Sequence, residues 1–440
     1  MLTSDARAPP SLGQLSASMA KARCRPQPVG HKGQLSLNHQ RVSRIEKLLP
    51  HSWQAAQLVS CCMVNIRTNG PLHFKALDPK QFDDLVRQHA EHDELSSAEY
   101  LARYQSVLGR SMDRQAKIYL DTLVWVRLKE TVLGKGKPEE EALLECLQKV
   151  VRQRKGLCVS HFHSLMEVAR QTEASLRVTA GLLQELTEGV VLVSPDELRA
   201  WECAQFVHEV IGCPAPPSYE KWTKVGFSHR SSLPRHLLPA NAPERVVDRT
   251  MKMATDHFWN VNFDQVFEAF SWDTRSKLAF DIGTDVIAKL EDIRKINRAD
   301  GRTFQSDRNP AFVECIDRQL LPLFEEVLAR HDCRDHLNMD RVLKAASEGF
   351  HKNKLGRQLG MSRLMVELYV LMVTADRPLT SNDYVDWAHA GAALPNCDVF
   401  ITERYLAHQL THELRADKSY GCEVVSGAAA ATKLLTERFL

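Results

Sequence analysis

Four acidic residues stand where carboxylates commonly do chemistry. Asp121 and Glu403 follow short apolar runs that predict buried strands. Glu167 falls on a predicted helix after another apolar segment, and Asp386 falls near the start of a further helix. Carboxylates that meet at one place repel each other, and they stay ionised together only when a cation neutralises them. Their hard oxygens suit Mg²⁺ or Mn²⁺, which activate water and stabilise charge on a phosphodiester.

The elements that must position these acids alternate between strand and helix. A predicted strand over 117–121 ends at Asp121, and an apolar segment over 157–160 leads into the helix that carries Glu167. This alternation favours an α/β sheet, and open sheets of this class bind ligands beyond the carboxyl ends of their strands. The other elements predicted around the acids are helices over 122–131, 139–152, 382–394, 404–414 and 428–440, and strands over 398–402 and 423–425.

Two residues near the acids each have two interpretations. Thr402 carries a hydroxyl suited to orienting a water or a carboxylate, but a threonine there also fits plain strand propensity. Asp383, one turn before Asp386, is either a helix cap or a fifth acid of the group.

Four segments of the chain resemble the PIN-domain nucleases. Residues 117–122 resemble the opening strand of that family, which ends in Asp followed by Thr or Ser. Residues 160–167 resemble its Ser-initiated helix that delivers a Glu. Residues 386–394 are similar to its Ala-rich helix, which opens with Asp and has His one turn on. Residues 398–403 resemble its last apolar strand, followed by Thr and an acid.

The resemblance covers about 117–210 and 381–440, and it implies a fold and an activity. The implied fold is a small PIN-like parallel sheet flanked by helices. The implied activity is metal-dependent hydrolysis of phosphodiester bonds, most often in RNA, which would make the chain an endoribonuclease that uses Mg²⁺ or Mn²⁺. The residues it implies are the catalytic and metal-binding acids Asp121, Glu167, Asp386 and Glu403, the alternative metal ligand Asp398, and the supporting residues Thr122, Thr402 and Asp383.

The middle of the chain is much longer than a minimal PIN-like fold needs. It shows helical patterning over 245–270, 273–297, 309–330, 339–350 and 357–374. The predicted division is a disordered leader (1–38), a helical extension (39–115), the first half of the PIN-like domain (116–210), a large all-helical insertion (211–380) and the second half (381–440).

The long insertion also motivates a second hypothesis. Leu123 stands where the family prefers Asn, and Glu403 stands where it prefers Asp. In this alternative the PIN-like part is a catalytically degenerate scaffold. The helical insertion is then the working surface, which binds a protein or nucleic-acid partner or associates with a second copy.

Other charged clusters are open to more than one interpretation. The basic residues Arg152, Arg154 and Lys155 suit phosphate contacts with nucleic acid, and equally suit a solvated surface. His408 and His412 share a helix face at the spacing of a zinc pair, but no third ligand is evident at zinc-site spacing, so ordinary histidines remain the alternative. The net charge of +2 neither requires nor excludes a nucleic-acid partner.

Composition sets broad limits on the class of protein. The 440 residues leave room for two or more domains, and 44% apolar with 25% charged residues is ordinary for a soluble globular protein. Eleven cysteines without a CxxC pair, and a beginning without a signal-peptide pattern, predict reduced thiols in a cytoplasmic protein. No apolar run reaches the roughly 18 to 20 residues of a membrane span, so no membrane partner is expected.

Overall fold

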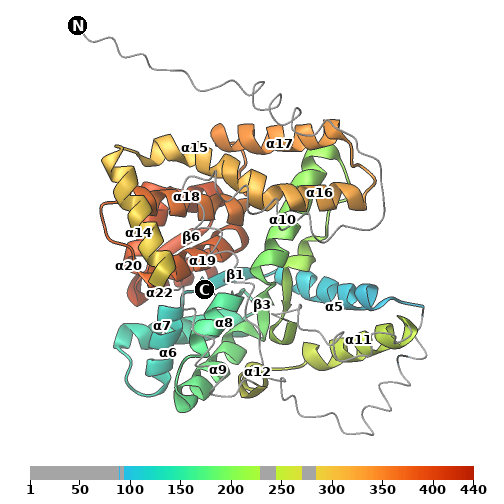
Figure 1. The fold of residues 1–440 in the computed structure, drawn as a ribbon. Helices are drawn as coiled ribbons and strands as arrows, with labels where there is room; N and C mark the ends of the chain where they lie inside the picture. Colours follow the sequence, from blue (N-terminus) through green and yellow to red (C-terminus); the bar gives the residue numbers. More distant parts are fainter. Residues whose placement is uncertain (1–88, 90–93, 228–243, 270–283) are drawn as a thin grey trace. The chain divides into compact units, whose positions relative to one another are not determined.

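The computed structural model describes residues 89, 94–227, 244–269 and 284–440 (Figure 1). The predicted leader, 1–38, lies outside the described residues, as does most of the predicted extension, 39–115. The described part of that extension ends in α5 (Ser97–Met112), whose first turn is closed by a capping box between Ser96 and Glu99.

A four-stranded parallel sheet with the strand order β2-β1-β5-β6 lies at the centre of the described fold. Its strands are β1 (Ala116–Leu120), β2 (Gly156–Val159), β5 (Val399–Thr402) and β6 (Glu423–Ser426). Strands β2 and β5 are buried along their whole length, whereas the edge strand β6 is exposed to half-buried. The predicted parallel sheet flanked by helices is confirmed, within a chain that is mostly helical.

The order of the strands creates a switch point between β1 and β5. From β1 the chain passes to β2 on one side, and it later enters β5 on the other side of β1. The two strands pair in register, with Leu120 beside Ile401. In open α/β sheets, ligands bind beyond the carboxyl ends of the strands at such a point. The residues that follow Leu120 and Thr402 therefore lie at the place where this topology favours a site.

Two short strands were not predicted. Strand β3 (Val190–Leu192) pairs antiparallel with β4 (Trp222–Lys224). Strand β3 also runs beside the end of β2, where the Leu192 amide donates to the Ser160 carbonyl at 2.9 Å. Three residues are too few to show a strand periodicity, so tertiary pairing rather than local pattern decides them. Strand β4 falls within the range assigned to the helical insertion.

The four predicted acids have different places relative to the helices that carry them. Helix α6 (Thr122–Val132) has Asp121 as its N-cap, and α20 (Arg404–His408) has Glu403 as its N-cap. Glu167 lies near the end of α8 (Phe162–Val168). Helix α19 (Ser381–Asn396), which begins with a capping box, carries Asp386 in its second turn. Asp121 and Glu403 are therefore placed where a strand ends and a helix starts, whereas Glu167 and Asp386 project from within helices.

The middle of the chain is helical where it is described. Ser194 closes a capping box at the start of α10 (Pro195–Ile211). The predicted helix over 245–270 divides into two helices, and the one over 309–330 is divided by a π-helical turn. The helices of this region are α11 (Glu244–Trp259), α12 (Phe263–Ala269), α14 (Thr284–Ala299), α15 (Phe304–Cys315), η5 (Ile316–Leu320), α16 (Leu321–Arg330), α17 (His336–His351) and α18 (Gly360–Thr374).

The remaining helices flank or connect these elements. They are α7 (Pro138–Arg152), α9 (Glu173–Thr187), η1 (Ser218–Lys221), η2 (Val225–Phe227), η6 (Gln409–Glu413), α21 (Ala416–Tyr420) and α22 (Ala428–Phe439). Helices α7 and α22 pack on each other, and α7 also packs against β2 and α22 against β6. Helix α19 packs against β5, α18 packs on α19, and α14 packs on α18 (Figure 1). Among the described helices, none is long and apolar enough to cross a membrane.

One hydrophobic core joins the sheet to the middle helices. It contains Leu120 from β1, Phe263 from α12, Leu290 from α14 and Leu368 from α18, all of them buried. Side chains of the predicted insertion therefore contribute directly to the core of the sheet. Any rearrangement of these helices must also disturb the packing beneath the acidic residues.

Candidate active site at the carboxyl edge of the sheet

Asp121 is held in a fixed orientation at the end of β1. The side chain is only 4% exposed. Its Oδ2 accepts a 2.6 Å hydrogen bond from the Thr402 hydroxyl, and its Oδ1 accepts a longer one, 3.4 Å, from the Leu123 amide. Thr402 ends the neighbouring strand, so the switch point itself brings these two side chains together. The Thr402 hydroxyl therefore orients a carboxylate, that of Asp121, as one of its two interpretations proposes.

Glu167 reaches the same edge from α8. Its Oε2 accepts a 2.5 Å hydrogen bond from the Thr122 hydroxyl and lies 2.7 Å from Nε2 of His389. Burial raises the pKa of Glu167, but the hydrogen bond from His389 and the positive charge of that ring outweigh it, so the pKa lies below its usual value. Glu167 is therefore ionised at neutral pH.

His389 is fully buried and connects two elements of the site. Its Nδ1 lies 2.8 Å from the Tyr119 hydroxyl, and its Nε2 faces Glu167. Burial lowers the pKa of His389, but the hydrogen bond to Glu167 and the nearby carboxylates reverse this effect and raise the pKa overall. A raised pKa favours an imidazolium that donates from both nitrogens, to Tyr119 and to Glu167.

Asp386 and Glu403 complete the acidic group. Burial, followed by repulsion from Asp121, raises the pKa of Asp386 to about 7, and Glu403 and Glu167 add to the same effect. Glu403 points toward the start of its own helix, where its Oε1 accepts from the Leu406 amide at 2.7 Å. Asp386 thus experiences the negative charge of all three other acids, while His389 acts in the opposite direction and lowers its pKa.

Hydrogen bonds between neighbours of the acids tie the four segments together. Thr402, which precedes Glu403, donates to Asp121; Thr122, which follows Asp121, donates to Glu167. His389, one turn after Asp386 on α19, bonds the same oxygen of Glu167. The structure therefore brings together Asp121, Glu167, Asp386 and Glu403, with Thr122 and Thr402 between them.

The donor set has the right chemistry for a hard cation, but it is not a preformed metal site. Carboxylate oxygens suit Mg²⁺ and Mn²⁺, and a cation would relieve the repulsion that raises the pKa of Asp386. In the described part of the chain, however, no group of three or more His, Cys, Asp or Glu side chains is arranged to hold a metal ion. Asp121, Glu167 and Glu403 each also accept a hydrogen bond from the protein.

Some of the predicted residues lie away from this group. Asp398 stands at the amino end of β5, where it accepts from the Lys117 amide at 2.8 Å and pairs with the Lys117 ammonium at 3.2 Å. Arg152, Arg154 and Lys155 are exposed in the turn that enters β2. A four-residue strand is about 13 Å long, which places all of them near the opposite edge of the sheet.

Asp383 and the histidine pair have local roles in the structure. Asp383 accepts from the Thr380 amide and hydroxyl at 2.7 and 2.8 Å, and it is also bonded by Arg377. Asp383 therefore takes part in the cap of α19, which is the first of its two interpretations. His408 and His412 stack with their ring centroids 4.7 Å apart on the surface of α20 and η6. Within the described residues, no third metal-binding side chain joins them.

Tyr119 and His389 belong to the site but are not among the residues predicted for it. Their places at the site could have been inferred from their spacing to Asp121 and Asp386. Tyr119 is two residues before Asp121 on a strand, and so lies on the same side of it; His389 is three residues after Asp386 on a helix, and so shares its face. His161 and His163, which alternate beside Glu167 in the sequence, are fully buried, with Nδ1 atoms 3.1 Å apart.

Comparison with known proteins identified no relative. No protein-family model, no curated protein and no solved structure matches the chain. The function is therefore argued from the geometry of the site and from the resemblance of its motifs.

Proposed function

We propose that the chain is a PIN-like, metal-dependent endonuclease that hydrolyses phosphodiester bonds, with RNA as its substrate. The observation that carries the proposal is the set of hydrogen bonds that joins the four segments carrying the acids at the switch point of the sheet, from Thr402 to Asp121 and from Thr122 and His389 to Glu167. Structural helix caps and surface acids do not require such a connection. The raised pKa of Asp386 is consistent with the proposal, because repulsion from Asp121, Glu403 and Glu167 adds to burial, which is its largest cause.

In this proposal Asp121, Asp386 and Glu403 hold Mg²⁺ or Mn²⁺ together with Glu167. When bound, the ion supplies positive charge to the phosphodiester and makes a water more acidic. The protein's own hydrogen bonds prepare its ligands. Thr402 fixes Asp121, and Thr122 with His389 fixes Glu167. Such outer partners commonly change metal affinity or activity by about 10- to 100-fold.

The direct test is an RNA cleavage assay with the full-length chain. Single-stranded RNA, labelled at one end, is incubated with the protein and Mn²⁺, and separately with EDTA present. We expect internal cleavage that requires the metal. RNA that remains intact at every Mn²⁺ concentration, under conditions where the protein is folded, contradicts the nuclease proposal.

The affinity for Mn²⁺ is expected to depend on pH. Below pH 7, Asp386 holds a proton that a metal must displace, because its pKa is raised to about 7. The dissociation constant should therefore fall about tenfold per pH unit between pH 5 and 7, and level off above that. Isothermal titration in buffers of different ionisation enthalpy measures both the affinity and the released proton. Asp386→Asn should bind more weakly and lose this dependence; an affinity independent of pH in the wild type contradicts the assignment.

A second candidate function is a degenerate scaffold whose middle helices bind a protein or nucleic-acid partner. The observation in its favour is that the described acids are turned toward protein donors rather than toward a common point. The same titration separates the two functions. Tight Mn²⁺ binding that Asp386→Asn removes supports the nuclease, whereas RNA binding without metal binding or cleavage supports the scaffold.

A further inference from the structure

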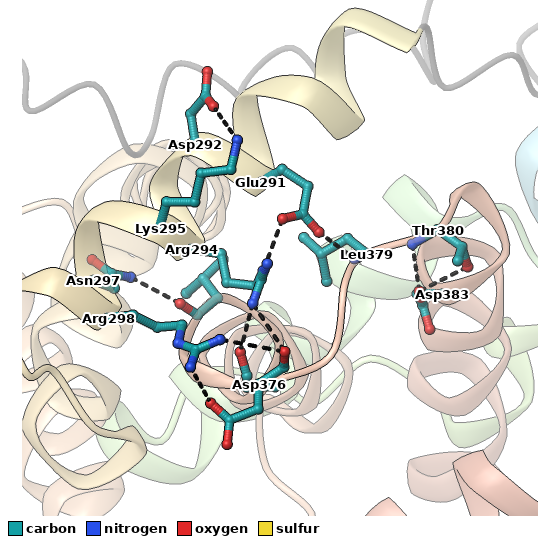
Figure 2. Close-up of polar contacts among 12 residues, drawn as sticks. Glu291, Asp292, Arg294, Lys295, Asn297, Arg298, Asp376, Leu379, Thr380 and Asp383 are labelled. Atoms are coloured by element: carbon teal, nitrogen blue, oxygen red, sulfur yellow. Dashed lines mark hydrogen bonds and ion pairs between the residues drawn. The ribbon is translucent and has the colours of Figure 1, made fainter.

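Helix α14 holds the connection between α18 and α19 with polar side chains (Figure 2). Nη1 of Arg294 donates to the carbonyls of Ala375 and Asp376 at 3.3 and 3.1 Å. Nδ2 of Asn297 donates to the carbonyl of Val373 at 3.3 Å. The last carbonyls of a helix have no partner within it, so α14 supplies donors that the end of α18 lacks.

The other end of this connection is held by the same helix. The Leu379 amide donates to one carboxylate oxygen of Glu291, and the other oxygen accepts from Nε of Arg294 at 2.8 Å (Figure 2). Leu379 directly precedes Thr380, the N-cap of α19. Glu291 and Arg294 therefore bond to each other and to both ends of the loop over 375–380.

The side of α14 that makes these contacts is buried, whereas the middle of the loop is exposed. Arg294 is only 8% exposed, and Leu290 and Ile293 beside it belong to the main hydrophobic core. Val373 and Leu379, whose carbonyl and amide bond to α14, are buried as well. A buried polar group that loses its partner is costly, so the contacts at these two buried ends hold the loop against α14.

The loop in turn contacts the two helices that carry Asp386 and Glu403 or begin at them. Arg377, within the loop, bonds Asp383 on α19, and its guanidinium stacks over the ring of Tyr405 on α20, 4.0 Å from the ring centroid. Asp386 lies one turn after Asp383, and Glu403 lies two residues before Tyr405. Arg377 therefore connects the loop to both helices near these acids.

We propose that Glu291 and Arg294 are positioning residues for the candidate active site, acting through the 375–380 loop on the placement of Asp386 relative to Glu403. They touch neither the acids nor a substrate. That α14 holds the loop in place is argued from the described contacts alone. That the loop affects metal binding by the acids rests on the proposed nuclease function. The two parts are tested by different measurements.

The first measurement is amide hydrogen exchange of the full-length chain, compared between wild type, Arg294→Gln and Lys295→Gln. Lys295 is the matched control, because it lies on the same helix, is 68% exposed and pairs only with Asp292 among the described contacts. We expect peptides covering 375–386 to exchange about tenfold faster in Arg294→Gln, the factor expected for loss of one hydrogen bond to a charged group. Unchanged exchange there overturns the proposal.

A milder variant covers the case in which Arg294→Gln does not fold. Glu291→Gln keeps an oxygen that can accept from Leu379 but weakens the bond to Arg294. It should accelerate exchange in the same peptides by a smaller factor. If Glu291→Gln instead leaves those peptides unchanged, the locking of the loop is wrong whatever the fate of Arg294→Gln.

The second measurement is the Mn²⁺ concentration that gives half-maximal RNA cleavage. In Arg294→Gln it should rise about tenfold, the lower range for loss of an outer support, and Arg294→Lys should recover part of this. A role in stability alone would lower the melting temperature without moving this concentration, and that result overturns the positioning role. If the loop exchanges faster but the wild type shows no Mn²⁺-dependent cleavage, the loop locking is upheld and the nuclease proposal fails.

Discussion

Asp121→Asn is expected to lower Mn²⁺-dependent RNA cleavage by about 10³-fold, because a metal contributes several kcal/mol of charge stabilisation to phosphodiester hydrolysis. Asparagine has nearly the same shape as aspartate, and its single amide oxygen can still accept the short hydrogen bond from Thr402, although the weaker one from the Leu123 amide is lost. It lacks the negative charge that a cation requires. The variant should therefore stay folded while losing activity, as initial rates with labelled RNA and thermal melting would show.

Two further Asp→Asn variants make this result specific. Asp196→Asn alters an exposed aspartate in the first turn of α10 and should cleave like the wild type. Asp398→Asn alters the acid at the opposite end of β5, which is engaged by Lys117, and it should also retain cleavage. Equal cleavage by wild type and Asp121→Asn would mean that the activity is not at this site. If Asp398→Asn lost as much cleavage activity as Asp121→Asn, Asp398 would again be a candidate metal ligand.

The sequence predicts the elements that carry the four acids because those elements have local signals. The strand that ends at Asp121 has an apolar run followed by a helix cap, and the residues around Asp386 show a capping pattern and an Ala-rich helix. The meeting of these acids is not local, however. It depends on the parallel pairing of β1 with β5, which joins residues from opposite ends of the described chain.

What the sequence cannot show is the partner of each polar side chain. Asp398 lies only five residues before Glu403, yet the strand between them carries it to the other edge of the sheet. The basic turn over 152–155 lies away from the acids for the same reason, since it enters β2 rather than leaving it. Strands β3 and β4 are missed because their three-residue segments acquire their structure from pairing.

The middle helices show the same limit. Amphipathic patterning indicates that α14 and α18 are helices, but it does not indicate which loop the polar side chains of α14 contact. Glu291 and Arg294 have the spacing of an ordinary surface ion pair on a helix. Only the packing of α14 on α18 brings them into hydrogen bonds with the backbone of the 375–380 loop. A region that resembles an insertion in sequence therefore supports the site in the structure.

His389→Leu is expected to lower the free energy of unfolding by about 2–4 kcal/mol, because it leaves the Glu167 carboxylate and the Tyr119 hydroxyl without the ring between them. Leucine fills a similar volume, so the loss reflects polar partners rather than a large cavity. Tyr119→Phe is the matched comparison. It removes one hydroxyl and should cost about 1 kcal/mol. Urea denaturation of both variants and of the double variant gives the coupling between the two side chains, which should be clearly different from zero.

The stabilisation by His389 should also depend on pH in a defined direction. Its pKa is raised in the folded protein, so the folded state binds the proton more tightly than the unfolded state. This contribution is fully present below the unfolded pKa of about 6.5, and it is lost as the pH rises through the folded pKa. The difference between His and Leu at this position should therefore be larger at pH 6 than at pH 9. The comparison belongs in an Asp386→Asn background, since Asp386, with its pKa near 7, titrates in the same range. A difference that grows as the pH rises would show that His389 is held neutral, and that Glu167 is oriented by a neutral ring.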